Sequence, residues 1–316
     1  MLVGPGFAAK RLTWAPIGSI ADMAVVQSNG MTIEYHERGE GQPLLLVMGL
    51  GGQLIDWPEA FVDELVAHGF RVISFDNRDS GLSTEFSGRP PTRAEIARSA
   101  LTRRPMKSEY LLHDMAGDAI GLLDHLRIDR AHVVGMSMGG MIAQQLAIDH
   151  PSRVQTLTSI MSTTGDRRAG RPTWRVVRRM LRREMPTLEN AIDMSLESFR
   201  ELSGPTFDPD EFRMLAEKSV ARSFRPEGTM RQLAAILASP DRTEDLSRVR
   251  VPTLVIHGML DNLVQPSGGV ATARAIHGAK LVMYNDMAHD LPRTRWKEIA
   301  DEIAAIAARA PLPARV

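Results

Sequence analysis

The stretch that most constrains this chain is Val133–Gly140, where an apolar run leads into Gly-x-Ser-x-Gly and then into a helix-like segment. A serine on a sharp strand-to-helix turn has a strained backbone, at a cost of about 1–3 kcal/mol. The glycines on either side of Ser137 lack the Cβ atoms that would clash in such a turn. The helix that follows directs free N–H groups and its positive dipole end at the same point. The pattern therefore predicts that Ser137 is a nucleophile beside an oxyanion site.

Strand and helix patterns alternate along most of the chain. Two short alternating segments flank Asn29–Gly30, which is a strong hairpin signal. Eight strands are predicted at residues 23–27, 31–37, 44–48, 71–75, 131–134, 154–160, 252–257 and 280–284, and helices at 57–68, 109–126, 138–149 and from 295 to about 309. Such alternation is typical of a parallel sheet covered by helices on both faces. We therefore predict an α/β fold with a mostly parallel eight-stranded sheet.

Three segments depart from this alternation. Residues 162–248 contain helical patterns but no convincing buried strand, so we predict a helical lid (cap) inserted after the sixth strand. Residues 1–22, which glycine and proline interrupt, are predicted to be an N-terminal extension, and residues 85–108 a long surface excursion. The predicted core then consists of residues 23–161 and 249–316.

Composition narrows the range of functions. The chain has 38 basic and 38 acidic residues, so no net charge draws it to nucleic acid. It has no Cys, which rules out disulfides, thiolate zinc sites and a cysteine nucleophile. No metal- or nucleotide-binding motif occurs, and we expect neither a metal nor a cofactor. No apolar stretch approaches the ~20 residues of a transmembrane helix, and we expect a cytoplasmic protein.

The serine needs a base and an acid, and both are expected beyond the carboxyl ends of the strands. Asp261 follows the seventh predicted strand and His289 follows the eighth. The chain order Ser137, Asp261, His289 is the Ser…acid…His order of one large group of hydrolases. These three residues are therefore the predicted nucleophile, acid and base.

Three other residues compete for these roles. Asp166 follows the sixth strand, which is a rarer place for the acid, and Asp290 adjoins His289, where a sequence neighbour usually points away from the ring. His257 also ends a strand, but it precedes Asp261 by only four positions. We expect His257 to be structural, and we rank Asp166 as the second choice for the acid.

From Met23 onward the chain resembles the α/β-hydrolase superfamily. The matching motifs are Gly135-x-Ser137-x-Gly139, His257–Gly258-x-x-Asp261-x-x-Val264 and the His289 loop. The stretches Val47–Gly51 and Asp76–Ser83 resemble a narrower group, the aclacinomycin methylesterase-like and mycobacterial lipase-like serine hydrolases. Many relatives have a histidine where this chain has Met48. The loss leaves the expected oxyanion donor unchanged, because that donor is a backbone N–H.

This resemblance implies an α/β-hydrolase fold and a serine carboxylic ester hydrolase, esterase-like or lipase-like, that works through an acyl-enzyme. Ser137 would attack the carbonyl carbon, His289 would carry the proton, and Asp261 would hold the imidazole. The backbone N–H groups of Leu50 and Met138 would bind the oxyanion. The substrate would be a small-molecule ester, lipid-like or anionic. The expected pocket residues are Met48, Gly49, Met136, Trp174 and Leu263.

Other functions remain open at this point. The same three side chains would serve a perhydrolase (haloperoxidase), a thioesterase, a C–C bond hydrolase or a hydroxynitrile lyase. A ligand-binding protein that keeps the triad but has negligible turnover is a further alternative. Dehalogenases and epoxide hydrolases are disfavoured, because they need a carboxylate where Ser137 stands. Fold resemblance does not choose the substrate.

An arginine-rich segment begins the predicted lid. Trp174, Val177 and Leu181 are spaced as on one side of an amphipathic helix. A basic face is usually solvated, and the alternative is a surface for an acidic substrate or for peripheral contact with an anionic membrane. The sequence leaves both interpretations open, as it does the oligomeric state. The basic residues concerned are Arg167, Arg168, Arg171, Arg175, Arg178, Arg179, Arg182 and Arg183, with Arg103, Arg104 and Lys107 from the other excursion.

Overall fold

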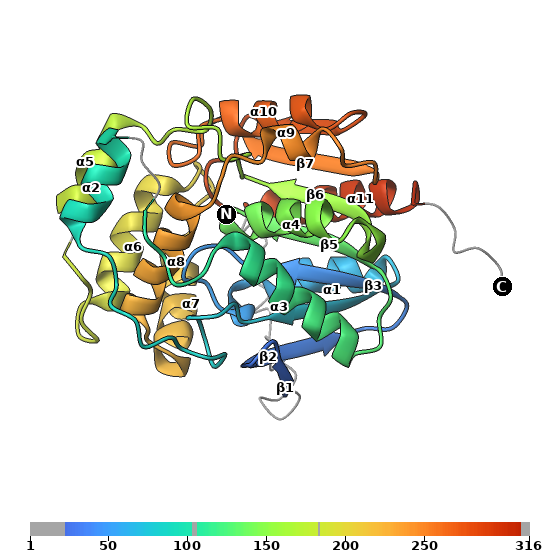
Figure 1. The fold of residues 1–316 in the computed structure, drawn as a ribbon, viewed down its shortest axis with the longest axis horizontal. Helices are drawn as coiled ribbons and strands as arrows, with labels where there is room; N and C mark the ends of the chain where they lie inside the picture. Colours follow the sequence, from blue (N-terminus) through green and yellow to red (C-terminus); the bar gives the residue numbers. More distant parts are fainter. Residues whose placement is uncertain (1–22, 103–105, 183, 311–316) are drawn as a thin grey trace, which may run out of the picture.

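The computed structural model describes residues 23–102, 106–182 and 184–310 (Figure 1). The predicted N-terminal extension, residues 1–22, lies outside these residues, as do Arg103, Arg104 and Arg183. Among the described residues, no helix combines the length and the apolar character needed to span a bilayer.

One sheet of eight strands organises the molecule, in the order β1-β2-β4-β3-β5-β6-β7-β8. β1 pairs antiparallel with β2 and β2 with β4, whereas the pairs from β4 to β8 are parallel. The predicted eight-stranded, mostly parallel sheet is therefore confirmed. The strands are β1 Ala24–Ser28, β2 Met31–Arg38, β3 Gln42–Val47, β4 Phe70–Phe75, β5 Ala131–Met136, β6 Val154–Ile160, β7 Thr253–Gly258 and β8 Lys280–Tyr284.

Helices cover both faces of the sheet (Figure 1). On one face lie α1 (Glu59–Ala67) and α11 (Trp296–Ala307), and on the other lie α3 (Leu112–His125), α4 (Met138–Asp149) and α10 (Ser267–Ala275). Leu44 and Leu46 of β3 pack towards the first layer, and Leu45 and Val47 towards the second. A strand buried on both sides needs apolar residues at every position, which explains the unbroken run that the sequence contains.

The segment predicted to be a surface excursion contains a helix, α2 (Arg93–Thr102), so this prediction was incomplete. Its first turn is closed by a capping box, in which Thr92 N–H donates to Glu95 and Glu95 N–H donates to the Thr92 hydroxyl. The Thr-x-x-Glu pattern was visible in the sequence. The proline and arginine residues around it masked the signal.

Between β6 and β7 the described chain is helical and contains no strand. The helices are α5 (Trp174–Arg182), α6 (Ala191–Leu202), α7 (Pro209–Arg222), α8 (Pro226–Ala238) and the short α9 (Thr243–Leu246). Figure 1 shows α5 to α8 grouped beside one end of the sheet rather than on its faces. We call these four helices the helical insertion. Single 3₁₀ turns occur at Leu54–Asp56, Pro151–Arg153 and Arg293–Arg295.

Candidate active site

Ser137 lies on the turn between β5 and α4 with φ 55° and ψ −118°, a conformation that a side-chain-bearing residue rarely adopts. A Cβ atom on Gly135 would lie 2.0 Å from the carbonyl oxygen of Gly139, and a Cβ on Gly139 would lie 1.9 Å from that of Val47. Main chain cannot move aside as a flexible side chain can. Both glycines are therefore required for the turn to form.

Ser137, His289 and Asp261 form a hydrogen-bonded chain. The Ser137 Oγ lies 2.9 Å from Nε2 of His289, and Nδ1 of the same ring lies 2.8 Å from Oδ2 of Asp261. Asp261 follows β7 and His289 follows β8, so three separate strand ends bring the groups together. The acid and the histidine are 3% and 9% exposed. This geometry lets the carboxylate accept from Nδ1–H and leaves Nε2 facing the hydroxyl.

The Asp261 carboxylate is also held by main chain. Its Oδ1 accepts from the N–H groups of Leu263 and Val264, both at 2.9 Å. Burial alone would raise the pKa of Asp261, but the charge of His289 and hydrogen bonds from His257 and His289 outweigh it. The pKa is lowered to about 2. The group is therefore ionised at neutral pH.

The two competing acids are held by other groups. Asp290 accepts from the N–H of Ala288 at 3.0 Å and from the N–H of Gly204 at 3.2 Å. Asp166 accepts from the N–H of Arg168 at 2.8 Å, within its own turn. Both carboxylates thus stabilise loops, and it is Asp261 that accepts the hydrogen bond from His289 Nδ1.

His257 is fully buried at the end of β7. Its Nε2 lies 2.7 Å from the carbonyl oxygen of Val264 and 3.4 Å from Oδ2 of Asp261. The ring therefore closes the loop that carries the acid, and it supports that carboxylate from a second direction. These contacts agree with the structural role expected for this histidine.

Residues Gly49–Gly52, which we call the oxyanion loop after the role expected from the sequence, form a turn closed by a 3.2 Å hydrogen bond from the last N–H to the first carbonyl. Gly51 has φ 70°, a value that glycine adopts without strain. A Cβ on Gly49 would lie 3.3 Å from the Cβ of Ser137, so the turn lies against this serine. Within the described chain, Leu50 N–H donates to no protein acceptor. Met138 N–H begins α4, where no intrahelical acceptor exists.

The residues expected to line a pocket have different environments. Met48 and Gly49 are buried where β3 leads into the Gly49–Gly52 turn. Met136, which precedes Ser137, and Leu263, whose N–H donates to Asp261, are half-buried. Trp174 differs from these four, because it is 73% exposed at the start of α5. Its side chain is therefore largely open to solvent in this structure, and its place in a substrate pocket stays a prediction.

The orientation of α5 accounts for the exposure of Trp174. Val176 of α5 is 3% exposed, so the side that carries this valine faces inward. Elsewhere on the helix Arg175 and Arg179 form ion pairs with Glu201, and Arg179 also lies 2.8 Å from Glu197 of α6. The apolar stripe expected at residues 174, 177 and 181 is therefore not the buried side of the helix.

The end of α6 contacts both loops that carry the acid and the histidine. The carbonyl of Leu202 accepts from His289 N–H at 2.9 Å, and the carbonyl of Glu201 accepts from the Asn262 side chain at 2.8 Å. The insertion is thus attached to the site by main-chain hydrogen bonds that the sequence pattern did not indicate.

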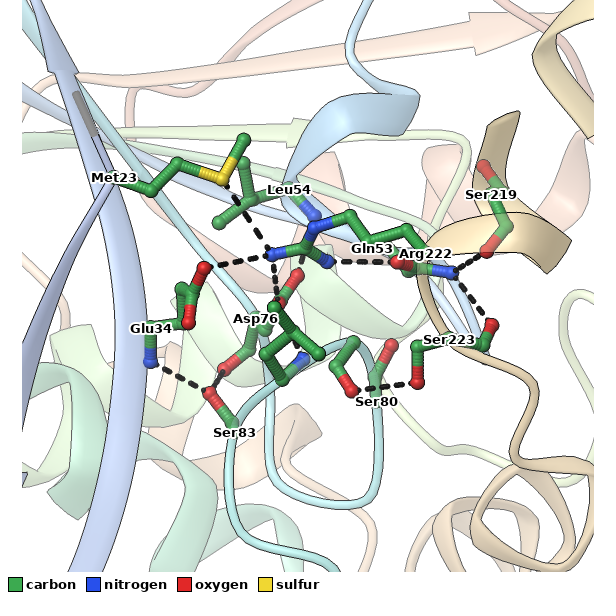
Figure 2. Close-up of polar contacts among 12 residues, drawn as sticks. Met23, Glu34, Gln53, Leu54, Asp76, Ser80, Ser83, Ser219, Arg222 and Ser223 are labelled. Carbon is green, nitrogen blue, oxygen red and sulfur yellow. Dashed lines mark hydrogen bonds and ion pairs between the residues drawn. The ribbon is translucent and has the colours of Figure 1, made fainter. Parts of the chain in front are cut away.

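Figure 2 shows a second group of residues that the sequence interpretation missed. Asp76, which is fully buried, accepts from Leu54 N–H at 2.7 Å and lies 2.7 Å from the guanidinium of Arg222. Arg222 also donates to the side-chain oxygen of Gln53 at 2.7 Å. The polar run after β4 was a visible signal for Asp76. An arginine at the end of an amphipathic helix carries no such signal, since most arginines there are solvated.

No group of three or more His, Asp or Glu side chains able to hold a metal ion occurs among the described residues.

Known proteins resemble this chain over most of its length. A family model described as alpha/beta hydrolase fold matches residues 42–292. The rhodomycin D methylesterase DnrP of Streptomyces peucetius is 30% identical over 286 residues, which cover 83% of this chain and 90% of the relative. A 2-hydroxy-6-oxononadienedioate/2-hydroxy-6-oxononatrienedioate hydrolase of Paraburkholderia xenovorans is 28% identical over 267 residues, covering 81% of this chain and 84% of that protein. The enol-lactonase structure from Burkholderia xenovorans has a TM-score of 0.67 at 22% identity, covering 90% of this chain and 100% of that one.

Proposed function

This chain belongs to the alpha/beta hydrolase fold family and is a carboxylic ester hydrolase, and we propose that it cleaves esters through an acyl-enzyme on Ser137. The observation that carries the proposal is the hydrogen-bonded chain Ser137–His289–Asp261. Beside it lie the backbone N–H groups of Leu50 and Met138, which donate to no acceptor among the described residues. A nucleophile, its base, an orienting carboxylate and an oxyanion site are the parts that acyl transfer needs.

In the acylation step, the Ser137 Oγ bonds to the ester carbonyl carbon while Nε2 of His289 takes the hydroxyl proton. The carbonyl oxygen becomes an oxyanion, which the N–H groups of Leu50 and Met138 stabilise. One such donor contributes about 3–4 kcal/mol to the transition state. The C–O bond to the alcohol then breaks, and His289 returns the proton to the leaving oxygen. Asp261 stabilises the imidazolium throughout this step.

Deacylation repeats these steps with water. His289 takes a proton from a water molecule, whose oxygen attacks the acyl carbon, and the same two N–H groups stabilise the second oxyanion. The bond to the Ser137 Oγ breaks, the oxygen regains its proton, and the carboxylic acid leaves. In this proposal the helical insertion acts as the lid, which supplies part of the substrate pocket and limits the access of water.

Methyl esters are the first substrates to test, because the two relatives that are 30% identical over 83% of this chain are both named rhodomycin D methylesterases. We expect turnover of aryl esters and of methyl esters of aromatic acids, together with stoichiometric labelling by a fluorophosphonate. A panel of esters with different acyl lengths, of thioesters and of a substrate for C–C bond hydrolases would define the range of bonds that the protein cleaves. Labelling without turnover of any ester would favour the ligand-binding alternative. A protein that the fluorophosphonate does not label would contradict the proposal.

We further propose that α5 contacts anionic lipid. Trp174 and Leu181 are 73% and 41% exposed, and Arg178 and Arg182 are exposed on the same side of the helix. Arginines beside exposed aromatic and apolar residues suit a lipid interface. We expect sedimentation with vesicles that contain phosphatidylglycerol and weaker sedimentation with pure phosphatidylcholine.

The variant Arg178→Gln/Arg182→Gln should lose this preference. Arg274→Gln/Arg309→Gln, which removes the same charge from exposed sites elsewhere, should keep it. Equal binding of the wild-type protein to both kinds of vesicle would refute the contact.

A further inference from the structure

Gln232 of α8 joins the helical insertion to the oxyanion loop. It is fully buried, and its side-chain oxygen accepts from Gly51 N–H at 2.8 Å. Its side-chain nitrogen donates to the carbonyl oxygen of Arg78 at 2.7 Å. Because one neighbour is a donor and the other an acceptor, only one orientation of the amide satisfies both. The side-chain amide of Gln232, which holds the loop, therefore has a single favoured orientation.

Arg78, whose carbonyl accepts from Gln232, is itself held in place by the core. Its guanidinium forms two hydrogen bonds of 2.7 Å with the two carboxylate oxygens of Asp118 on α3, and both side chains are buried. A bidentate pair of this kind restricts both position and angle. The carbonyl that orients Gln232 thus belongs to a segment attached to the core.

The oxyanion loop is also held from its other sides. Asn77 donates to the carbonyl of Met48 at 3.0 Å, and the Ser80 hydroxyl donates to the carbonyl of Gly52 at 2.6 Å. Beyond the turn, the Gln53 side chain donates to the carbonyls of Ser219 and Ser223 at the end of α7 (Figure 2). These contacts hold the ends of the turn. Gln232 holds the peptide plane in its middle.

The peptide that Gln232 binds adjoins the proposed donor. It joins Leu50 to Gly51, whereas the Leu50 N–H belongs to the peptide before it. A flip of the central peptide of a turn would change ψ of Leu50 and φ of Gly51 and would leave the Leu50 N–H direction almost unchanged. The contact from Gln232 instead fixes where the middle of the turn lies, and with it the distance from the Leu50 N–H to Ser137 in the proposed mechanism.

We propose that Gln232 is a positioning residue for the oxyanion hole, through which the helical insertion fixes the position of the turn that carries the Leu50 N–H. The inference rests on the proposed function, since it assigns a role within the same site. It adds a dependence of catalysis on a residue of the insertion that lies 95 positions after the nucleophile in sequence.

The test replaces Gln232 with a side chain of similar length that has no amide, Gln232→Met. Its matched control is Ser239→Ala on the same helix, because the Ser239 hydroxyl accepts from Leu112 N–H of the core at 3.0 Å, remote from the oxyanion loop in sequence. Each variant leaves one main-chain N–H without its side-chain acceptor, and Gln232→Met also leaves the Arg78 carbonyl without its donor. The loss of thermal stability should therefore be somewhat larger for Gln232→Met.

Removing an oxyanion donor costs about 10²–10³-fold in kcat, and displacing one should cost less, about 10- to 100-fold. We expect Gln232→Met to lower kcat for an aryl ester by this factor, with KM changed by less than about 2-fold. The inhibition constant of a trifluoromethyl ketone, which forms an oxyanion on Ser137, should rise by a similar factor. Ser239→Ala should leave kcat and this inhibition constant at wild-type values.

A second variant, Gln232→Glu, keeps an acceptor for Gly51 N–H and cannot donate to Arg78 when ionised. Burial raises the pKa of such a carboxyl group, so its activity relative to wild type should increase as the pH falls. If Gln232→Met does not fold, this pH trend tests the inference alone, and its absence contradicts it.

Wild-type kcat and ketone affinity in Gln232→Met would overturn the inference, as would equal losses in Ser239→Ala. Failure of the proposed function has a different signature, since the wild-type protein itself would then show no Ser137-dependent labelling by a fluorophosphonate.

Discussion

Replacing Ser137 with alanine is expected to lower kcat for an aryl ester by about 10⁶-fold, the loss seen when a serine hydrolase of this mechanism loses its nucleophile. The reason is that no acyl-enzyme can form. Binding need not suffer, because the pocket and the two backbone N–H groups stay in place. The measurement is initial-rate kinetics together with labelling by a fluorophosphonate, which should disappear.

Ser162→Ala is a suitable control. Ser162 is a buried serine close to the same turn, where a Cβ on Gly140 would lie 2.6 Å from its Cβ, and its hydroxyl has no hydrogen-bond partner among the described residues. We expect activity near that of the wild type. If Ser137→Ala kept even a hundredth of the wild-type kcat, Ser137 would not be the nucleophile.

The second large effect is expected for Asp261→Asn, with kcat lower by about 10⁴-fold. An asparagine can keep the geometry, but its amide nitrogen cannot accept the proton of His289 Nδ1. The imidazole then favours the tautomer in which Nε2 carries the proton and cannot act as the base. KM should change little, because Asp261 lies behind the histidine ring.

Asp290→Asn tests whether the position of the charge matters. Asp290 adjoins the same histidine, but its oxygens accept from backbone N–H groups of Ala288 and Gly204. We expect a loss of less than about 10-fold, due to disturbance of the loop. A loss in Asp290→Asn equal to that in Asp261→Asn would refute the assignment of the acid.

The lowered pKa of Asp261, about 2 in the folded chain against 3.8 ordinarily, also predicts a pH dependence. A carboxyl group whose pKa is lower in the folded state stabilises that state while it is ionised. Its contribution is complete above about pH 4 and is lost as the pH falls through about 2. Asp261→Asn should therefore melt at a lower temperature than the wild type at pH 7, and the difference should shrink towards pH 2. Catalysis between pH 5 and 9 should not follow the titration of Asp261.

Much of the fold was predictable because its signals are local. A strand buried on both faces must be apolar at each position, as in Leu44–Val47, and the turn at Ser137 requires glycine where main chain passes within 2.0 Å of a Cβ. The carboxyl-end rule then limited the partners of the serine to residues just after strand ends. These arguments predicted all eight strands and the three side chains that the structure brings within hydrogen-bonding distance.

Predictions for α2 and α5 were less accurate, because their signals compete with others. The polar helix α2 lies among prolines and arginines, and α5 buries the side with Val176 rather than the stripe at residues 174, 177 and 181. Spacing along a helix cannot show which side a partner far along the chain will cover.

The sequence by itself therefore determined the strand–turn–helix at Ser137 and the strand ends that carry Asp261 and His289, because these depend on residues within a few positions of one another. Only the tertiary structure decided that Asp261, rather than Asp166 or Asp290, lies against the ring. It alone placed Gln232 against the oxyanion loop. A glutamine on an amphipathic helix gives the same sequence pattern whether its side chain faces solvent or forms hydrogen bonds with the main chain of a distant loop. The packing of the insertion against the core distinguishes the two.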